Sequence, residues 1–151
     1  MKNSLWSEAE RFSLADYRVL TALASPWREE VKPLLRSAGV VPQSVGTLDE
    51  ALEALEFQQT DFFLFSEKFG ASDLKSDPLL EYIQTLPSAT RRNFFVVLVS
   101  PKLKSGDLWS AFSFSVNLIL HPDYLPELVK RIEKSWSAWR DQYRVFLQSQ
   151  T

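Results

Sequence analysis

Five short apolar runs, alternating with segments that carry helix signals, constrain the fold of this chain more than any other feature of its sequence. The runs are Tyr17–Ala24, Val40–Val45, Asp61–Ser66, Phe94–Pro101 and Val116–Leu120. Most are continuously apolar rather than alternating, which is typical of strands covered on both faces. Strands that alternate with helices predict a parallel sheet with right-handed crossovers. We therefore expect an α/β domain of three layers, with helices on both faces of a five-stranded parallel sheet.

Helix signals of different strength lie between the runs. Thr47 and Glu50 form a capping box, whose side chains can satisfy free backbone amides reciprocally. Leu48, Leu52 and Leu55 follow at helical spacing and predict one buried stripe. Further helices are expected over residues 27–38, 79–86, 108–114 and 126–148.

Two prolines and a glycine bear on the element boundaries. Pro33 lacks a backbone donor, so the helix over residues 27–38 either starts late enough to place Pro33 in its first turn or is kinked there. Gly39 is expected to cap the C-terminus of this helix. Pro42 favours an edge position for the second strand.

Composition sets limits on the class of protein. The 151 residues fit one domain, which we expect over residues 17–136, with a helical N-terminal extension over 1–16 and an extension of the last helix over 137–151. A formal charge of -2 gives no overall attraction to nucleic acid or to an anionic membrane. The absence of cysteine and the single histidine exclude disulfides, thiolate sites and multi-histidine metal sites, and they fit a reducing cytoplasm. No signal peptide or membrane span is apparent, so we expect a cytoplasmic protein.

The order of the elements resembles the receiver domain of bacterial response regulators, a flavodoxin-like fold with five strands. The resemblance covers roughly residues 18–136 and is clearest in VGTLDEALEALEFQQTDFFLFS. It is also visible in RVLTALASPW, FFVVLVSP and NLILHP. In folds of this kind, ligands and chemistry lie at the carboxyl ends of the strands. The resemblance therefore directs attention to the residues that end each strand.

Active receivers carry a phosphoacceptor aspartate after the third strand, and the resemblance places Ser66 at that position. A hydroxyl cannot form an acyl phosphate. The lysine that follows the fifth strand in the family is replaced by His121, with Pro122 retained. Only Ser100 matches the family, at its hydroxyl position after the fourth strand.

The acidic pair that binds magnesium in active receivers is also missing. It falls on Leu23 and Ala24, or on Ala24 and Ser25 if the register slips by one. Magnesium needs hard oxygen ligands, usually carboxylates, so this pair would not hold it. The resemblance therefore predicts a pseudo-receiver that keeps the scaffold, with a degenerate phosphoacceptor pocket and with neither catalytic residues nor a metal or other cofactor.

Other interpretations of the same region stay open. Loop acids could substitute for the missing carboxylates; they are Glu67, Asp73 and Asp77. Ser66 could be phosphorylated by a separate serine kinase, or it could simply bond to backbone. His121 could act as an acid, a base or a pH sensor, although it has no identifiable partner and more often such a residue is structural. The four glycines are too scattered for a nucleotide loop, so an enzyme is not expected.

If the degenerate phosphoacceptor pocket has no activity, the function is expected to lie on the surface of the domain. The C-terminal helix carries one apolar stripe, made by Leu128, Ile132, Trp136, Trp139, Tyr143 and Phe146. Its outer turns should extend past the sheet and pack either on the N-terminal stripe of Leu5, Trp6, Ala9 and Phe12 or on a second chain, giving a homodimer. The expected partner or dimer surface comprises Trp109, Phe112, Phe114, Trp136, Trp139, Tyr143 and Phe146.

Two candidate functions, from different classes of protein, follow from these expectations. The first is a protein-interaction or scaffold module in bacterial signalling that works without phosphorylation. The second is a small-molecule sensor whose ligand occupies the vacated cleft near Ala24, Ser66, Ser100 and His121. No nucleic acid and no membrane insertion are expected in either case.

Overall fold

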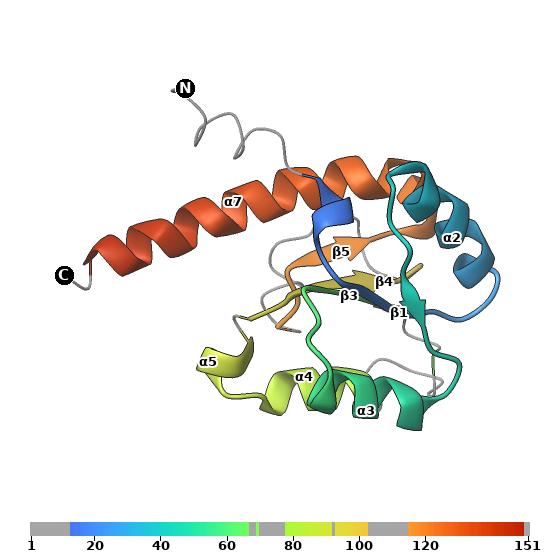
Figure 1. The fold of residues 1–151 in the computed structure, drawn as a ribbon, viewed down its shortest axis with the longest axis horizontal. Helices are drawn as coiled ribbons and strands as arrows, with labels where there is room; N and C mark the ends of the chain where they lie inside the picture. The colour runs from blue at the N-terminus through green and yellow to red at the C-terminus, as the bar shows by residue number, and fades with distance from the viewer. Residues whose placement is uncertain (1–12, 67–68, 70–77, 92, 103–114, 150–151) are drawn as a thin grey trace.

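The structure is a computed structural model and describes residues 13–66, 69, 78–91, 93–102 and 115–149, with the side chains of residues 88, 140 and 142–149 left aside. Five strands and the helices between them alternate along the chain (Figure 1). The strands are β1 (Val19–Ala22), β2 (Gln43–Ser44), β3 (Phe62–Ser66), β4 (Phe95–Val99) and β5 (Leu118–Leu120). The α-helices are α2 (Trp27–Ser37), α3 (Leu48–Phe57), α4 (Pro78–Thr85), α5 (Ser88–Arg91) and α7 (Leu128–Ser149). Short 3₁₀ helices are η1 (Leu14–Asp16) and η3 (Pro122–Glu127).

The strands form one parallel sheet in the order β2-β1-β3-β4-β5, which confirms the predicted five-stranded α/β architecture. Every residue of β1, β3, β4 and β5 is buried, as the continuous apolar runs predicted. The two residues of β2 are exposed, and β2 lies at the edge of the sheet. The edge position that Pro42 indicated is therefore confirmed, because a residue without a backbone donor is tolerated there.

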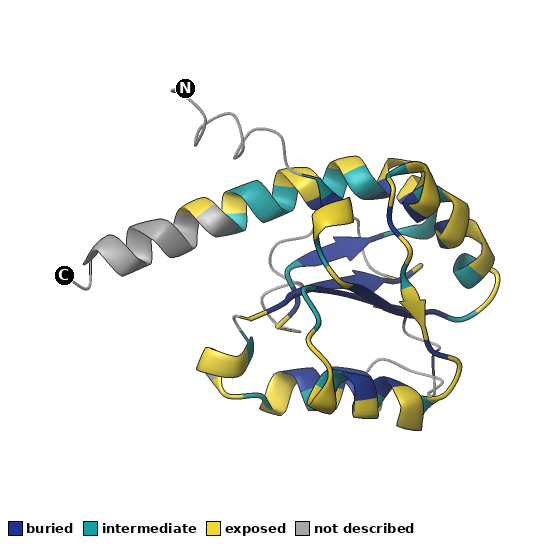
Figure 2. Ribbon diagram, in the orientation of Figure 1, coloured by how far each residue is buried: buried dark blue, intermediate teal, exposed yellow. Residues whose placement is uncertain are grey.

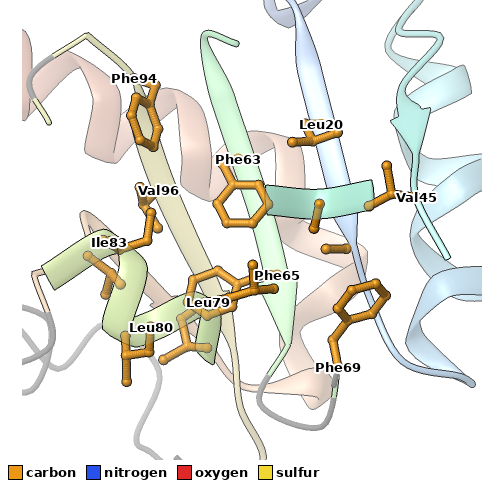
Figure 3. Close-up of a cluster of buried hydrophobic side chains, with 14 of the residues drawn as sticks. Leu20, Val45, Phe63, Phe65, Phe69, Leu79, Leu80, Ile83, Phe94 and Val96 are labelled. Carbon is orange, nitrogen blue, oxygen red and sulfur yellow. The ribbon is translucent and has the colours of Figure 1, made fainter. Parts of the chain in front are cut away.

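Helices cover both faces of the sheet, with α2 and α7 on one side and α3, α4 and α5 on the other (Figure 1). The dark, buried strands lie between helices whose outer surfaces are exposed (Figure 2). Phe63, Phe65, Leu79 and Ile83 belong to the core between the sheet and the second group of helices (Figure 3). A separate core on the opposite face joins α2 and α7 to the sheet.

Helix α2 begins at Trp27, so Pro33 lies in its interior and not in its first turn. The helix ends in a Schellman motif, in which Val40 N–H donates to the Leu35 carbonyl and Gly39 N–H donates to the Arg36 carbonyl, at 2.9 Å each. Gly39 has a φ of 81°, a conformation that side chains disfavour. The predicted glycine cap is therefore confirmed.

The capping box at the start of α3 is present as predicted. Thr47 Oγ1 accepts from Glu50 N–H at 3.2 Å, while Glu50 Oε1 accepts from Gly46 and Thr47 N–H. The predicted stripe needs a correction, because the fully buried positions are Ala51 and Ala54. The predicted leucines, Leu48, Leu52 and Leu55, are only partly buried and pack around this line. Small side chains therefore make the closest approach of the helix to the sheet.

Several boundaries differ from the sequence-based expectation. The last helix starts at Leu128 and not near Pro126, because residues 122–127 form the 3₁₀ helix η3. The short helix α5 was not predicted, since its four residues carry no periodic pattern. The helix expected over residues 108–114 and most of the N-terminal extension lie outside the described residues. Within the described part of the chain, no helix is both long and apolar enough to cross a membrane.

Candidate functional site

The carboxyl edge of the sheet brings the predicted pocket residues together. Leu23 and Ala24 follow β1, Ser66 ends β3, Ser100 follows β4, and His121 follows β5. Ser66 pairs with Val99 in the parallel register, so Ser66 and Ser100 end on neighbouring strands. Ser100 N–H donates to the Leu120 carbonyl at 3.1 Å, next to His121. The sequence-based grouping of these positions at one edge is therefore reproduced by the fold.

Ser66 is completely buried, and its hydroxyl has a defined backbone partner. Its Oγ accepts a hydrogen bond from Ala24 N–H at 2.9 Å, with a relative exposure of 0% for the residue. This bond ties the end of β3 to the loop between β1 and α2. Of the roles weighed for Ser66, the arrangement favours backbone bonding over access to a kinase or a phosphodonor.

Leu23 and Ala24, where the sequence resemblance places an acidic pair, have apolar side chains, and the guanidinium of Arg28 lies beside them. The Leu23 side chain is buried in the core between the sheet and the helices α2 and α7. Its carbonyl oxygen accepts from Arg28 Nε at 3.0 Å. Ser25, the alternative position, donates its hydroxyl to Glu29 Oε2 at 3.1 Å. A fixed guanidinium next to the end of β1 further disfavours a divalent cation by like-charge repulsion.

Ser100 and His121 also bond to nearby backbone. Ser100 Oγ accepts from Lys102 N–H at 3.2 Å. His121 Nδ1 accepts from Asp123 N–H at 3.0 Å and so caps η3, with Asp123 Oδ2 at 3.6 Å. His121 is therefore a capping residue, and its Nδ1 already accepts a hydrogen bond from the backbone.

The described residues contain no cluster of three or more histidine, cysteine, aspartate or glutamate side chains that could hold a metal ion. The loop acids that could have replaced the missing carboxylates, Glu67, Asp73 and Asp77, lie outside the described residues. The described part of the carboxyl edge therefore contains the buried hydroxyls of Ser66 and Ser100, an imidazole and a guanidinium, but no group of three or more carboxylates.

A pocket of about 370 Å³ opens beside this edge. It is lined by Ala24, Ser25, Arg28, Gly46, Thr47, Leu48 and Phe69. Ser66, Ser100 and His121 are not among its lining residues. The start of α3 borders the pocket, and the carboxylate of Glu50 accepts there from the amides of Gly46 and Thr47, which immediately precede the helix. The vacated cleft expected for a ligand is therefore only partly represented by this pocket.

The first half of the aromatic stripe on α7 packs on the domain itself. The ring centroids of Trp136 and Tyr17 lie 5.8 Å apart. The ring centroids of Trp139 and Phe95 lie 6.1 Å apart, and these two rings pack edge to face. Both tryptophans remain partly exposed. The other residues of the expected partner surface lie outside the description, as whole residues for Trp109, Phe112 and Phe114 and as side chains for Tyr143 and Phe146.

Arg91 is an important polar residue that sequence reasoning missed. Its guanidinium donates to the carbonyl oxygens of Phe94 and Ser115 at 2.7–3.0 Å and to Asn117 Oδ1 at 2.7 Å. Asn117 Oδ1 also accepts from Val96 N–H. Burial lowers the pKa of Arg91 to about 10, so the side chain remains charged at neutral pH. No sequence signal indicated this site, because most of its acceptors lie 24 or 26 residues away.

Comparisons with known proteins give structural matches only. No protein-family model matches the sequence, and no curated protein matches it. An orphan response regulator of H. pylori is similar over 80% of this chain and 97% of its own, with 18% identity and a TM-score of 0.60. The receiver domain of a sensor histidine kinase from Pseudomonas aeruginosa, which coordinates a magnesium ion in its active-site cleft, is similar over 81% and 98% of the two chains, with 20% identity and a TM-score of 0.60.

A third match is the chemotaxis response regulator CheY4 of Vibrio cholerae, with 11% identity and a TM-score of 0.56 over 77% of this chain and 98% of that one. These identities are low, so the likeness concerns the course of the backbone and not the chemistry of individual sites. The protein therefore has the flavodoxin-like α/β fold of response-regulator receiver domains.

Proposed function

We propose that this protein is a pseudo-receiver that acts in bacterial signalling as a protein-interaction or scaffold module, without aspartyl phosphorylation and without catalysis. The observation that carries the proposal is the burial and the hydrogen bonding of Ser66. The sequence resemblance places this residue at the phosphoacceptor position of receivers, and in the structure it is completely buried and accepts a hydrogen bond from Ala24 N–H. The sequence predicts that the module works in the cytoplasm.

The surroundings of Ser66 support the same function. Phosphoryl transfer to a receiver requires a carboxylate nucleophile and a metal ion that offsets phosphate charge. Here Leu23 and Ala24 supply no ligand oxygen from their side chains, and the positively charged guanidinium of Arg28 lies at the Leu23 carbonyl. A scaffold that keeps the strands but omits the charges can still present a fixed surface to a partner.

Incubation of the protein with acetyl phosphate and magnesium, followed by intact-mass measurement, tests the absence of phosphorylation. We expect no added phosphate, because no carboxylate stands at the phosphoacceptor position. An active receiver domain treated in parallel controls for the reagent. A mass increase of one phosphate on this protein would contradict the proposal and would point to an acid elsewhere, with Glu67, Asp73 and Asp77 as the first residues to map.

A protein partner is the second part of the proposal. We propose that the chain forms a homodimer through its C-terminal helix and offers the aromatic surface of that helix to a further protein. Capture from native lysate with the wild-type protein and with Ser66→Asp tests whether binding depends on a charge at the phosphoacceptor position. We expect the same captured protein with both baits, and loss of binding with Ser66→Asp in a correctly folded protein would argue for a charge-dependent switch.

A small-molecule sensor has less support. Ser66 and Ser100 have a relative exposure of 0%, so they present no surface to a ligand. The pocket that includes Ala24 is lined by Arg28 and by the start of α3 instead. We therefore place the function on the surface of the domain.

A further inference from the structure

The amino edge of the sheet, opposite the edge that holds Ser66, carries apolar side chains that the domain does not cover. Val41 has a relative exposure of 91% and Phe57 of 75%, the two highest values among the large hydrophobic residues that the structure describes as exposed. Val41 lies shortly before β2, and Phe57 ends α3, which leads into β3 through a short loop (Figure 1). Single exposed apolar residues are ordinary, whereas apolar residues beside a hollow indicate an interaction site.

Two pockets open along this edge, one on each side of the loop between α3 and β3. The first, of about 520 Å³, lies between that loop and the starts of β1 and β2, and Val41 lines it. The second, of about 410 Å³, lies between the loop and the residues that precede β4. Both are lined by Gln58, Gln59 and Thr60. The loop is therefore a ridge between two hollows, and Phe57 directly precedes it in the chain.

Carboxamides form much of the polar lining of the two pockets. They belong to Gln43, Gln58, Gln59 and Asn93. A carboxamide offers an acceptor oxygen and a donor nitrogen, as a peptide bond does. Among the described residues, Gln59 is the only one of the four whose side chain has a hydrogen-bond partner. The amino edge is therefore suited to bind main-chain groups that have no partner of their own.

One cation, Arg18, lines the first pocket and is held in position there. Its Nη1 donates to Gln59 Oε1 at 3.1 Å, and no carboxylate of the described residues forms an ion pair with it. The acid that lines the second pocket is Asp61, whose Oδ2 accepts from the backbone N–H of Arg18 at 2.8 Å. The guanidinium in the first pocket therefore has no ion-pair partner within the described part of the chain.

We propose that the amino edge binds an extended segment of a partner protein, in which an acidic side chain pairs with Arg18 and apolar side chains pack on Val41 and Phe57. The proposal rests on the proposed function, because it names a second partner surface of the same interaction module and the chemistry of the partner. An extended segment fits because its main-chain groups are unpaired, whereas those of a helix already bond to one another. An acid fits because it supplies the charge complementary to Arg18.

The dimensions of the edge agree with an extended segment. The two pockets follow the starts of β2, β1, β3 and β4, which are neighbours in the sheet. Strands lie about 4.8 Å apart, so this row spans roughly 14 Å, the length of about four extended residues. Such a segment is long enough to carry one acid and two apolar side chains.

A second copy of this chain is a poorer occupant of the amino edge. A symmetric contact places the same patch on both sides. It would set Arg18 of each copy against a surface whose lining acid, Asp61, already accepts from backbone. A different protein can supply the acid that this contact lacks.

Selection from a random linear peptide library displayed on phage, with the full chain as bait, tests the proposal. We expect enriched sequences that share an acidic residue beside apolar residues. Counter-selection on Arg18→Gln/Phe57→Ser removes peptides that bind elsewhere, and this variant should melt like the wild type because both side chains are exposed. The proposal is overturned if no sequence is enriched on the wild type over this variant, or if the enriched sequences lack an acid.

Fluorescence polarisation with a labelled synthetic peptide of the enriched sequence then measures the part of each side chain. Arg18→Gln and Phe57→Ser should each weaken binding by roughly tenfold. The matched controls are Lys130→Gln and Tyr124→Ser, an exposed cation and an exposed aromatic residue that follow the carboxyl end of β5, and both should bind like the wild type. Equal affinity of all four variants for the peptide would place its site elsewhere and overturn the proposal.

The acid of the peptide gives a readout that does not depend on the stability of any variant. Its replacement by the corresponding amide should weaken binding to the wild type about as much as Arg18→Gln does. The same replacement should add little further loss with Arg18→Gln, because the pair is already broken. Fully additive losses would show that the acid contacts another residue and would contradict the pairing with Arg18.

Failure of this proposal can be told apart from failure of the proposed function. If capture from lysate retrieves the same protein with the wild type and with Arg18→Gln/Phe57→Ser, the amino edge is not the partner surface, whereas the interaction module stands. If the protein takes up phosphate from acetyl phosphate, the proposed function fails, whereas peptide binding at the amino edge is unaffected.

Discussion

At the scale of single residues, the buried serine hydroxyls at the carboxyl edge of the sheet accept hydrogen bonds from backbone amides. A carboxylate at position 66 would be a fully buried charge, which is costly unless it is paired. The Ser66 hydroxyl supplies an acceptor for Ala24 N–H at 2.9 Å without that cost. Ser100 has the same character, since it is completely buried and accepts from Lys102 N–H.

Ser66→Ala should lower the free energy of unfolding by about 1–2 kcal/mol, because the Ala24 N–H loses its acceptor while the side chain volume changes little. Urea unfolding monitored by tryptophan fluorescence measures the change. The matched control is Ser25→Ala, whose hydroxyl bonds to Glu29 at an exposed position and should matter by less than about 0.5 kcal/mol. Equal stability of the two variants would show that the Ser66 bond is not a significant constraint.

Arg91→Lys should be more damaging, with a loss of about 2–3 kcal/mol, because hydrogen bonds from charged donors are among the stronger ones. A lysine keeps the charge but cannot reach Phe94, Ser115 and Asn117 together with one nitrogen. Thermal unfolding should show this loss, with Arg36→Lys, which is exposed in the last turn of α2, as the conservative control. Equal melting temperatures for both variants and the wild type would show that the contacts of Arg91 do not stabilise the segment that leads into β5.

At the scale of elements, local capping chemistry fixes the helix boundaries. Helix α3 begins at the Thr47–Glu50 capping box, and α2 ends at the positive φ of Gly39. Interior packing then decides which face is buried, and in α3 this face is centred on Ala51 and Ala54. Capping is local and follows from adjacent residues, whereas the buried face depends on the distance between helix and sheet.

The capping box should make stability depend on pH. Hydrogen bonds from the amides of Gly46 and then Thr47 hold the pKa of the Glu50 carboxyl below its ordinary value of 4.5. Its folded pKa is therefore lower than its unfolded pKa, so its contribution is present above about pH 4.5 and is lost as the pH falls through the folded value.

Comparison of wild type with Glu50→Gln isolates the charge, because glutamine keeps an acceptor oxygen. We expect the variant to melt at a lower temperature at pH 7, and the gap to close as the pH falls below 4.5. Glu53→Gln on the same helix removes an equal charge away from the cap and should show no such closing gap. A gap that stays constant down to pH 3 would mean that the Glu50 charge does not support the cap.

At the scale of the whole molecule, the sheet is covered on both faces, and one helix continues beyond it. Figure 1 shows the inner part of α7 lying over the sheet and its outer part running past the domain. Trp136 packs against Tyr17, and Trp139 packs against Phe95. The surface that we assign to a partner therefore lies toward the outer end of the helix.

The homodimer prediction belongs to this scale. Sedimentation equilibrium at micromolar concentrations should give the mass of two chains, and the variant Tyr143→Ser/Phe146→Ser should give the mass of one, because it removes the apolar contact of the outer helix end. Lys134→Ser, at an exposed position of α7, should remain dimeric. A single-chain mass for the wild-type protein would contradict the prediction.

Much of the fold could be predicted because it depends on short-range patterns. The continuous apolar runs around Phe63 and Val97 predicted buried parallel strands, and both lie fully buried in the sheet. The positions of Ser66 and Ser100 at strand ends also followed from those runs. By contrast, the main contacts of Arg91 could not be predicted, because Ser115 and Asn117 lie 24 and 26 residues away in the sequence. The short helix α5 could not be predicted because its four residues carry no periodic pattern.

The sequence by itself determined the alternation of strands and helices and the caps of α2 and α3, since each depends on residue type and local spacing. That Ser66 falls at a phosphoacceptor position is what the resemblance to receiver domains implies. Only the tertiary structure decided that Ser66 meets Ala24 N–H, 42 residues away. It also decided that Trp136 and Trp139 face the domain. These contacts depend on strand register and helix placement, which are fixed by long-range packing and not by any one segment.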